Sequence, residues 1–305
     1  MPASPAAAVY GTVLPALADT PAGAVQVSPL MPGAASLEAM EAGSLASMLM
    51  LAPPGTVERR YAIAQALRAL APDGRLTVLA PKDKGGSRLA GDLAALGAPF
   101  NETARRHHRI CVAGRPADLG AVEGAIAEGA PRYLERLGLW TQPGVFSWDR
   151  VDAGTAQLME RMPALTGPGA DLGCGLGVLA ARVLQSPAVS ALVLVDNDRR
   201  AVEAARRNVD DARADIRWAD VRAMEQAPAD LDFVVMNPPF HDGGAEDRAL
   251  GQAFIRQAAA MLKMGGVLWI VANRHLPYEA VLAEHFARVT PHGEGAGFKV
   301  HEARR

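Results

Sequence analysis

Short apolar runs and longer helical stretches alternate along the second half of the chain. The runs 192–195 and 233–236 have the length and unbroken apolar character of strands that are buried on both faces. The stretches 199–209, 249–262 and 277–286 have the length of helices and separate such runs. Because strands that alternate with helices are joined by right-handed crossovers, this pattern predicts a parallel sheet in an α/β fold.

The first half shows the same alternation between residues 45 and 127, and it reads as a decayed copy of the second half. Two pairs of segments align, 70–80 with 262–272 and 48–55 with 233–240. In that alignment Ala52 replaces Asn237 and Gly55 replaces Phe240. Chance similarity between two α/β units is the alternative explanation. If the alignment is real, the first copy keeps the fold without the second copy's chemistry.

Length and composition agree with two domains. The chain has 305 residues, half of them apolar, which is more than one core usually holds. We expect one domain at 1–130 and another at 131–305. Residues 1–44 are rich in Ala and Pro, and we expect them to include a mobile start and fragments of the first sheet. The connection between the halves is expected to contain a short helix at 132–137.

Several classes of protein are disfavoured. No apolar stretch is long enough to span a membrane, and the N-terminus lacks the pattern of a signal peptide, so we expect a cytoplasmic protein without membrane contact. The two cysteines, Cys111 and Cys174, do not form a disulfide framework. The adjacent His107 and His108 do not converge on one face, so no metal site is expected.

The run 233–236 ends in a motif suited to binding a planar amine. It is followed by Asn237, Pro238, Pro239 and Phe240. The Asn237 oxygen and the Pro238 carbonyl both accept hydrogen bonds, while the two prolines fix the backbone and remove competing donors. Phe240 offers a ring on which a base can stack. A strand that simply stops at a Pro-Pro turn is the alternative.

A glycine-rich turn lies upstream of this motif. Glycines at 173, 175 and 177 follow Asp171 and allow a ligand to approach the backbone closely. The strand at 192–195 then ends in Asp196, where an acidic side chain suits a ribose diol. A further acidic residue, Asp220, follows Trp218 and is placed to accept from an adenine amino group. Together these positions point to an adenosine-containing cofactor, although each alone is more often a helix cap or a solvated turn.

The order of these motifs, DLGCGLG, VDND, AD and NPPF, resembles the class I S-adenosylmethionine-dependent methyltransferases. The flanking segments PGVFS (143–147), ANRHLPY (272–278) and FKV (298–300) narrow the resemblance to the RsmC/RlmG group of ribosomal RNA guanine-N2 methyltransferases. The resemblance covers most of residues 131–305. It implies two tandem Rossmann-like methyltransferase domains, of which the N-terminal one is degenerate, and a closing antiparallel hairpin that contains 297–301.

The resemblance also implies a set of site residues. S-adenosylmethionine is the cofactor, held by Asp171, Gly173, Gly175, Gly177, Asp196, Asn197, Asp220 and Asn237. The residues that bind the reacting base are Asn237, Pro238, Phe240 and His241, although a polar lid is the plainer interpretation of His241. The expected reaction is direct methyl transfer to the N2 amine of a guanosine, with the small ribosomal subunit favoured.

The first half carries a local excess of positive charge. Between residues 57 and 110 there are ten Lys and Arg against five Asp and Glu, whereas the whole chain has a net charge of −2. Such a field is expected where a protein docks a phosphate backbone. We therefore expect Lys82, Lys84, Arg105 and Arg106 to contact ribosomal RNA or a ribosomal subunit. A solvated surface is the alternative.

Other functions stay open at this point. A clamp for a planar amine also suits methylation of adenine N6 or of a glutamine side chain in a protein. A non-catalytic RNA-binding or ribosome-assembly factor is a further alternative, but such a factor has no need of the acidic positions or of NPPF. We expect the protein to act as a monomer.

Overall fold

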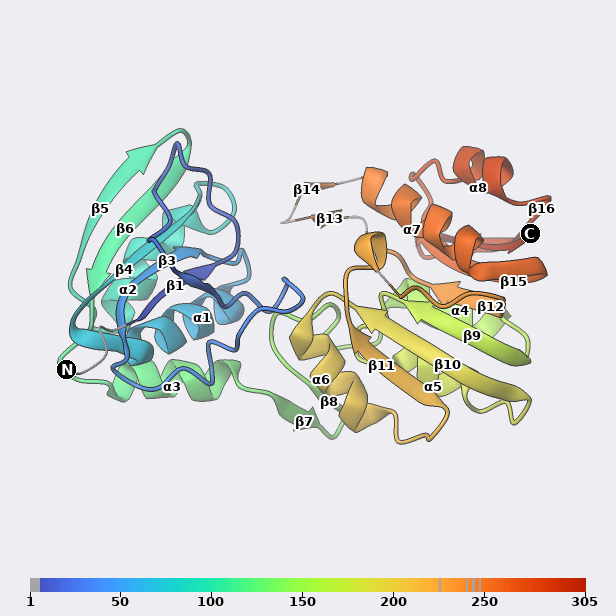
Figure 1. Cartoon of the computed structure of the whole chain (residues 1–305), viewed down its shortest axis with the longest axis horizontal. Coiled ribbons are helices and arrows are strands. Elements are labelled where there is room, and N and C mark those ends of the chain that lie inside the picture. Colours follow the sequence, from blue (N-terminus) through green and yellow to red (C-terminus); the bar gives the residue numbers. More distant parts are fainter. Residues whose placement is uncertain (1–5, 225, 240, 243–244, 247) are drawn as a thin grey trace. The chain divides into compact units, whose positions relative to one another are not determined.

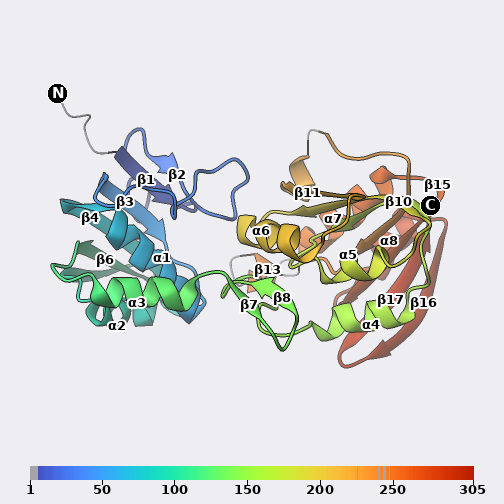
Figure 2. The same cartoon turned by 90° about the horizontal axis from the view of Figure 1, so that it is seen from below.

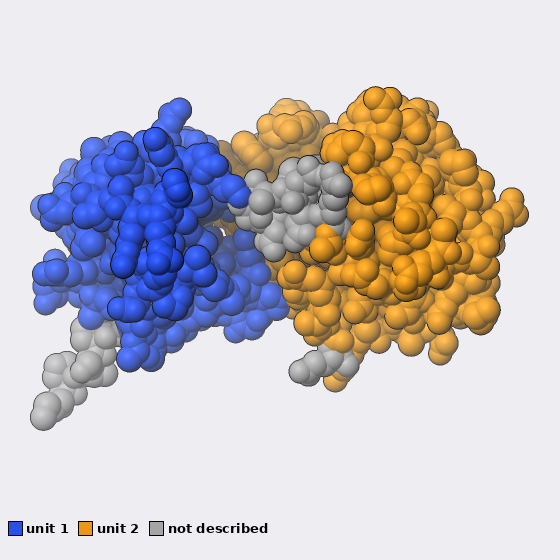
Figure 3. Space-filling model, turned by 90° about the horizontal axis from the view of Figure 1, so that it is seen from above, with its two compact units in different colours: residues 1–130 blue, residues 131–305 orange. Residues whose placement is uncertain are grey.

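The computed structural model describes residues 6–224, 226–239, 241–242, 245–246 and 248–305. The chain forms two compact units, Met1–Ala130 and Pro131–Arg305 (Figure 3). Each unit has its own sheet and its own buried core.

The second unit is built on a seven-stranded mixed sheet (Figure 1). In spatial order its strands are β11 (Ala214–Trp218), β10 (Val189–Asp196), β9 (Gly167–Leu172), β12 (Leu231–Met236), β15 (Leu262–Asn273), β17 (Phe298–Arg304) and β16 (Arg288–Gly295). The first five run parallel, whereas β17 is antiparallel to both of its neighbours. The predicted parallel sheet and its closing antiparallel hairpin are therefore confirmed.

Helices cover both faces of this sheet (Figures 1 and 2). On one face lie α7 (Arg248–Met261) and α8 (Glu279–His285), and on the other lie α4 (Ala153–Arg161), α5 (Val178–Val183) and α6 (Arg199–Asn208). The three long helical stretches predicted in this half are found within two residues of their expected ends.

The central strand β12 explains why its sequence is apolar without a break. Phe233 and Val235 enter the core beneath α4 and α5, whereas Val234 and Met236 enter the core beneath α7. Alternate side chains of one strand therefore fill two cores. In the neighbouring strand β9, Gly169 pairs with Phe233, and a Cβ at Gly169 would lie 2.1 Å from the Phe233 ring. The poor β-forming sequence of β9 thus makes room for the ring.

The first unit has a six-stranded sheet of its own. In spatial order its strands are β2 (Val25–Gln26), β1 (Ala6–Tyr10), β3 (Leu45–Leu51), β4 (Leu70–Pro81), β6 (His108–Gly114) and β5 (Phe100–Arg105). Its helices are α1 (Thr56–Ala69), α2 (Leu89–Ala95) and α3 (Gly120–Gly129), and a 3-10 turn, η1 (Gly86–Arg88), precedes α2.

The two sheets share one topology. The order β2-β1-β3-β4-β6-β5 of the first sheet repeats the order β10-β9-β12-β15-β17-β16 of the second, and only β11 lacks a counterpart among the described strands. Matching elements have equal lengths: 14 residues in α1 and α7, 12 in β4 and β15, and 7 in α2 and α8. The segments aligned by sequence, 48–55 with 233–240 and 70–80 with 262–272, thus begin in or cover corresponding strands.

The prediction of a short helix at 132–137 is wrong. This segment belongs to a hairpin of β7 (Arg132–Leu134) and β8 (Leu139–Thr141), which turns at Gly138 with a φ of +66°. Tyr133 lies opposite Trp140, and their rings meet edge to face with centroids 6.0 Å apart. An aromatic cross-strand pair of this kind favours the strand conformation over the helical one.

Across the described ranges, no helix combines the length and the apolar character that a membrane span requires.

Candidate active site

The glycine-rich turn follows β9 at the carboxyl end of the parallel strands. All three glycines have positive φ: +76° at Gly173, +52° at Gly175 and +80° at Gly177. They serve different purposes, because a Cβ at Gly177 would lie 2.7 Å from Val209, whereas a Cβ at Gly175 would meet nothing within 4 Å. Gly177 therefore lets α5 pack closely against α6, while Gly175 leaves bare backbone facing open space.

Two acidic residues stand beside this turn. Asp196, at the end of β10, accepts hydrogen bonds from the backbone N–H of Gly175 and of Asp198, each at 2.8 Å. Burial raises the pKa of Asp196 to about 6. Asp171 is only 1% exposed, and burial, with a smaller contribution from the Asp196 charge, raises its pKa to about 8. Asp196 thus holds the turn, and burial favours the neutral form of the Asp171 carboxyl.

The remaining predicted cofactor residues lie at the ends of β10 and β11. The Asp220 carboxylate binds the Arg222 guanidinium at 2.7 Å, and this hydrogen bond lowers the pKa of Asp220. The carbonyl of Asn197 accepts a 2.9 Å hydrogen bond from the Trp218 indole N–H. The acid and the aromatic ring are therefore both ordered at the edge where the sequence places an adenine site, and their contact with a cofactor stays a prediction.

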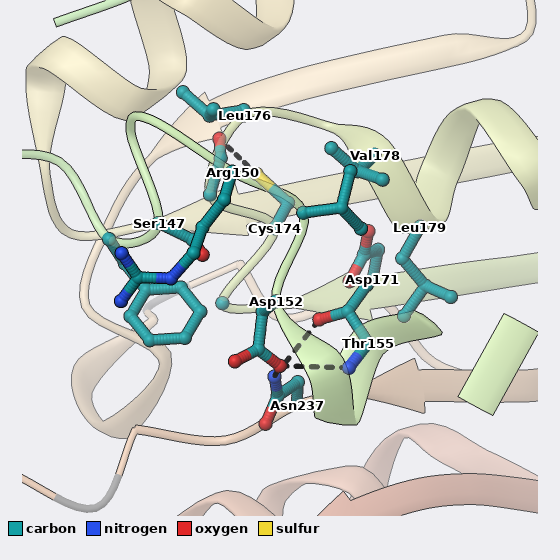
Figure 4. A pocket seen from close by; sticks show the side chains of 14 residues that line it. Ser147, Arg150, Asp152, Thr155, Asp171, Cys174, Leu176, Val178, Leu179 and Asn237 are labelled. Atoms are coloured by element: carbon teal, nitrogen blue, oxygen red, sulfur yellow. Dashed lines mark hydrogen bonds between the residues drawn. The ribbon is translucent and has the colours of Figure 1, made fainter. Parts of the chain in front are cut away.

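Asn237 is anchored by the first turn of α4 (Figure 4). Its amide nitrogen donates to Asp152 Oδ2 at 2.9 Å and to Thr155 Oγ1 at 3.0 Å. The same Asp152 oxygen caps the helix by accepting from the Thr155 backbone N–H at 2.8 Å. Among the described residues no donor contacts the Asn237 oxygen, which leaves this atom available to a substrate.

Some of these groups line one pocket, whose empty space, open mouth included, is about 480 Å³. Its walls are formed by Phe146, Ser147, Arg150, Val151, Asp152, Thr155, Asp171, Gly173, Cys174, Gly175, Leu176, Val178, Leu179 and Asn237. Four of the predicted site residues are in this set, namely Asp171, Gly173, Gly175 and Asn237. Gly177, Asp196, Asn197, Asp220 and Pro238 lie outside it, and Pro238 is buried. Phe240 falls outside the described residues, and His241 is described only as backbone of β13 (His241–Asp242), paired with β14 (Ala245–Glu246).

Sequence reasoning missed several residues of this pocket. Asp152 and Thr155 have the spacing of a helix N-cap, which gave no sign that they also bind an asparagine 85 and 82 positions away, respectively. Phe146 and Ser147 belong to the PGVFS segment, which was noted only as a family feature. The structure brings both to the pocket, and the Phe146 ring is 57% exposed there.

The other family segments support α4 and the end of the sheet. Lys299 in β17 is buried and forms an ion pair with Glu279, the first residue of α8. Phe298 packs against Gly154, where a Cβ would lie 2.8 Å from its ring. The segments ANRHLPY and FKV are thus held together, and Phe298 reaches the helix turn that anchors Asn237.

In the first unit, the side chain of Gln26 binds the backbone of Gly11, in the turn that corresponds to the glycine-rich turn. Gln26, at the end of β2, occupies the position that Asp196 has at the end of β10. Its amide oxygen accepts from Gly11 N–H at 3.0 Å, and its amide nitrogen donates to the Gly11 carbonyl at 3.1 Å. At the equivalent of the NPPF motif, the buried Arg59 donates to the carbonyl of Pro54, the counterpart of Pro239, at 2.8 Å.

The basic residues of the first unit fall into two groups. Arg59 is buried against Asp92, and Arg68 binds the carbonyls of residues 37, 38 and 40, so both support the fold and are unavailable to RNA. Apart from Arg75, the exposed Lys and Arg of residues 57–110 lie at one corner, where Lys82 N–H donates to the His107 carbonyl at 2.8 Å. That contact joins the loop after β4 to the turn of the β5–β6 hairpin. We call this region, formed by residues 82–88 and 105–109, the cationic corner.

Comparison with known proteins agrees with this geometry. The model of the "Methyltransferase small domain" family matches residues 136–302. The ribosomal RNA small subunit methyltransferase C of Pseudomonas aeruginosa strain LESB58 is 34% identical over 86% of this chain and 80% of its own length. The protein of that name from Pseudomonas fluorescens is 33% identical over 75% of this chain and 70% of its own length.

Among solved structures, the 16S rRNA N2 methyltransferase RsmC of T. thermophilus in complex with AdoMet and guanosine has the same fold. It matches with a TM-score of 0.78 at 24% identity and covers 98% of this chain and 88% of that one. Identity above 30% across most of both sequences shows the family directly. The chain belongs to the ribosomal RNA small subunit methyltransferase C family.

Proposed function

We propose that this protein transfers the methyl group of S-adenosylmethionine to the N2 amine of a guanosine in 16S ribosomal RNA. The observation that carries the proposal is the hydrogen bonding of the Asn237 side-chain amide. Both of its N–H groups are bound within the protein, so its oxygen is free to accept from an amine at a pocket beside the glycine turn. The chain's relatives are named for methylating small-subunit ribosomal RNA, and the T. thermophilus relative holds AdoMet and guanosine.

The pocket fits the proposed cofactor. Gly175 presents bare backbone to open space, and one oxygen of the buried Asp171 carboxyl has no hydrogen-bond partner among the described residues. A hydrogen-bond donor on a ligand would satisfy that oxygen. When bound, S-adenosylmethionine supplies an electrophilic methyl group. The residues that would hold it are Asp171, Gly173, Gly175, Gly177, Asp196, Asn197, Asp220 and Asn237.

The chain's own contribution to transfer is to orient the amine. Its two N–H groups would donate to the Asn237 oxygen and to the Pro238 carbonyl, which directs the nitrogen lone pair and stabilises the positive charge that develops on it. No strong general base is needed, because the methylated ammonium loses its proton readily. Phe240 would stack on the base, and His241 would contact the substrate near it.

The first unit would dock the RNA while the second performs the chemistry. Lys82, Arg105 and Arg106 are exposed in the cationic corner, and Lys84 lies in the same loop. Phosphate contacts from such a corner would hold the RNA without reading its sequence. The base must leave its stack to reach Asn237, which favours an unpaired or partly disassembled RNA. On this proposal the protein works in the cytoplasm as a monomer.

The proposal is tested in a strain from which the gene has been deleted. Digestion of its small-subunit RNA to nucleosides, followed by mass spectrometry, should show the loss of one N2-methylguanosine. A plasmid carrying the wild-type gene should restore that nucleoside, and Asn237→Ala should not, since it removes the amine acceptor. Purified Asn237→Ala should remain folded and should still bind S-adenosylhomocysteine, because the other seven residues that would hold the cofactor are unchanged.

Three results would refute the assignment. An unchanged N2-methylguanosine content in the deletion strain would exclude this substrate. Loss of N6-methyladenine or of a methylated protein glutamine would identify another amine. Full restoration by Asn237→Ala would remove the clamp mechanism.

A further inference from the structure

The contacts of Asn237 determine which of its atoms faces the substrate. A side-chain amide has two N–H donors and one carbonyl oxygen. Here both donors are used, one by Asp152 Oδ2 at 2.9 Å and one by Thr155 Oγ1 at 3.0 Å. Rotating the amide by half a turn would bring its oxygen against the Asp152 carboxylate, where two acceptors repel each other. The amide is therefore locked with its oxygen outward.

The acidic partner also affects the strength of that oxygen as an acceptor. A carboxylate that accepts from an amide N–H makes a charge-assisted hydrogen bond and polarises the amide. The polarised oxygen carries more negative charge. It therefore interacts more strongly with an amine that becomes cationic during transfer than with the neutral amine of the bound substrate, which is the difference that accelerates a reaction.

The first turn of α4, which carries Asp152 and Thr155, is held in place by the strands packed against it. Gly154 lies between these two residues and packs against the Phe298 ring, as its absent Cβ would lie 2.8 Å from that ring. Further along α4, the Arg161 guanidinium donates to the His292 carbonyl at 3.0 Å. Contacts from both ends of the helix to β16 and β17 therefore fix the first turn, so the position of Asp152 and Thr155 does not depend on a flexible loop.

We propose that Asp152 and Thr155 are positioning residues for methyl transfer: they act through Asn237 by fixing and polarising the oxygen that receives the substrate amine. The inference rests on the proposed function, in that it assumes an amine is the methyl acceptor. Both side chains line the pocket, yet neither is assigned contact with the reacting atoms.

Three substitutions separate this role from a structural one. Thr155→Val removes the acceptor while the backbone N–H that Asp152 caps is retained. Thr155→Ser keeps the hydroxyl. Asp152→Asn keeps an oxygen for both of its hydrogen bonds, the one from Asn237 and the one that caps the helix, since Asn caps helices as well as Asp does, and it removes only the charge. Asp118→Asn is the matched control, because Asp118 also accepts from a backbone N–H before a helix, in the first unit.

The assay is single-turnover transfer of a labelled methyl group to small-subunit RNA that lacks the modification, with affinity for S-adenosylhomocysteine and the unfolding temperature measured in parallel. We expect Thr155→Val and Asp152→Asn each to lower the transfer rate about tenfold, which is the effect expected of one lost or weakened hydrogen bond. The control variant and Thr155→Ser should stay near the wild-type rate. Affinity for S-adenosylhomocysteine should be unchanged in all four.

The decisive arm repeats Thr155→Val in an Asn237→Ala background, where residual transfer is followed over long incubations. If Thr155 acts through Asn237, the second substitution has no further effect. A further tenfold loss there would overturn the inference, as would unchanged rates in both single variants or a loss explained by weaker S-adenosylhomocysteine binding. Failure of the proposed function is distinguishable, since the wild-type protein itself would then leave guanosine unmethylated.

Discussion

Gly175 is the residue at which backbone conformation and open space coincide. Its φ is +52°, and a side chain there would project into space that no protein atom occupies within 4 Å. We expect Gly175→Val to abolish S-adenosylmethionine binding by filling this approach. Gly265→Val is the matched control, because Gly265 also has a positive φ and an open Cβ position, in a distant turn. Calorimetry that finds equal binding in the two variants would refute the placement of the cofactor.

Asp171 predicts a dependence of stability on pH. Its pKa is raised from 3.8 to about 8 in the folded protein, chiefly by burial. A carboxyl with a raised folded-state pKa contributes stability below its unfolded pKa and loses that contribution as the pH rises through its folded pKa. We therefore expect Asp171→Asn to gain in unfolding temperature relative to the wild type between pH 4 and pH 8. Parallel curves for the two proteins would contradict the buried, protonated state of Asp171.

The sequence reveals the residues of the site whose role is local. Glycine-rich turns, acids at strand ends and the NPPF segment are local motifs. From them the sequence predicted Asp171, Gly175 and Asn237 as site residues, and the structure places all three in one pocket. Asp152 and Thr155 were missed because their partner is 85 and 82 residues away, and nothing short of the folded sheet brings them together. Side chains that act on other side chains leave no local pattern.

At the scale of elements, the β5–β6 hairpin is the most distinctive feature of the first unit. Its turn places Arg106 at a φ of +45° and His107 at +61°, where turns of this kind favour Asn and Gly. Holding a residue such as Arg in that conformation costs about 1 kcal/mol. The turn thus keeps an exposed cation at its tip despite the backbone cost, beside Arg105 and the loop of Lys82.

We expect Arg105→Glu and Arg106→Glu each to weaken RNA binding and to reduce the slope of its salt dependence by about one, as the loss of a phosphate contact requires. Arg75→Glu is the control, since Arg75 is exposed in the middle of β4, opposite Gly114 at the end of β6 that lies away from the hairpin turn. Filter binding across a range of salt concentrations measures both quantities. Equal slopes for all three variants would show that the cationic corner does not dock RNA.

Elements were predictable where burial dictates the sequence. The strands β10 and β12 are buried on both faces, so their apolar runs are unambiguous, and the long helices between them follow from length alone. The hairpin at 132–141 was missed because its segments are only three residues long and its stability comes from a cross-strand ring contact. No periodicity can develop over so few residues.

At the scale of the whole molecule, two sheets of the same topology differ in what fills the carboxyl ends of their strands. The second unit leaves a pocket there, whereas the first binds Gln26 to Gly11 and Arg59 to Pro54. We expect one molecule of S-adenosylhomocysteine to bind per chain in calorimetry, with no residual binding in Gly175→Val. A stoichiometry of two would show that the first unit has kept a cofactor site.

The most direct test of the account is a crystal structure of the wild-type protein with S-adenosylhomocysteine and guanosine. The account predicts the sulfur of the ligand beside Asn237 and the guanine N2 about 3 Å from the Asn237 oxygen and the Pro238 carbonyl. It also predicts that the Asn237 nitrogen keeps its bonds to Asp152 and Thr155. A cofactor bound away from the glycine turn, or a base presented to Asn237 by another edge, would contradict the central claim.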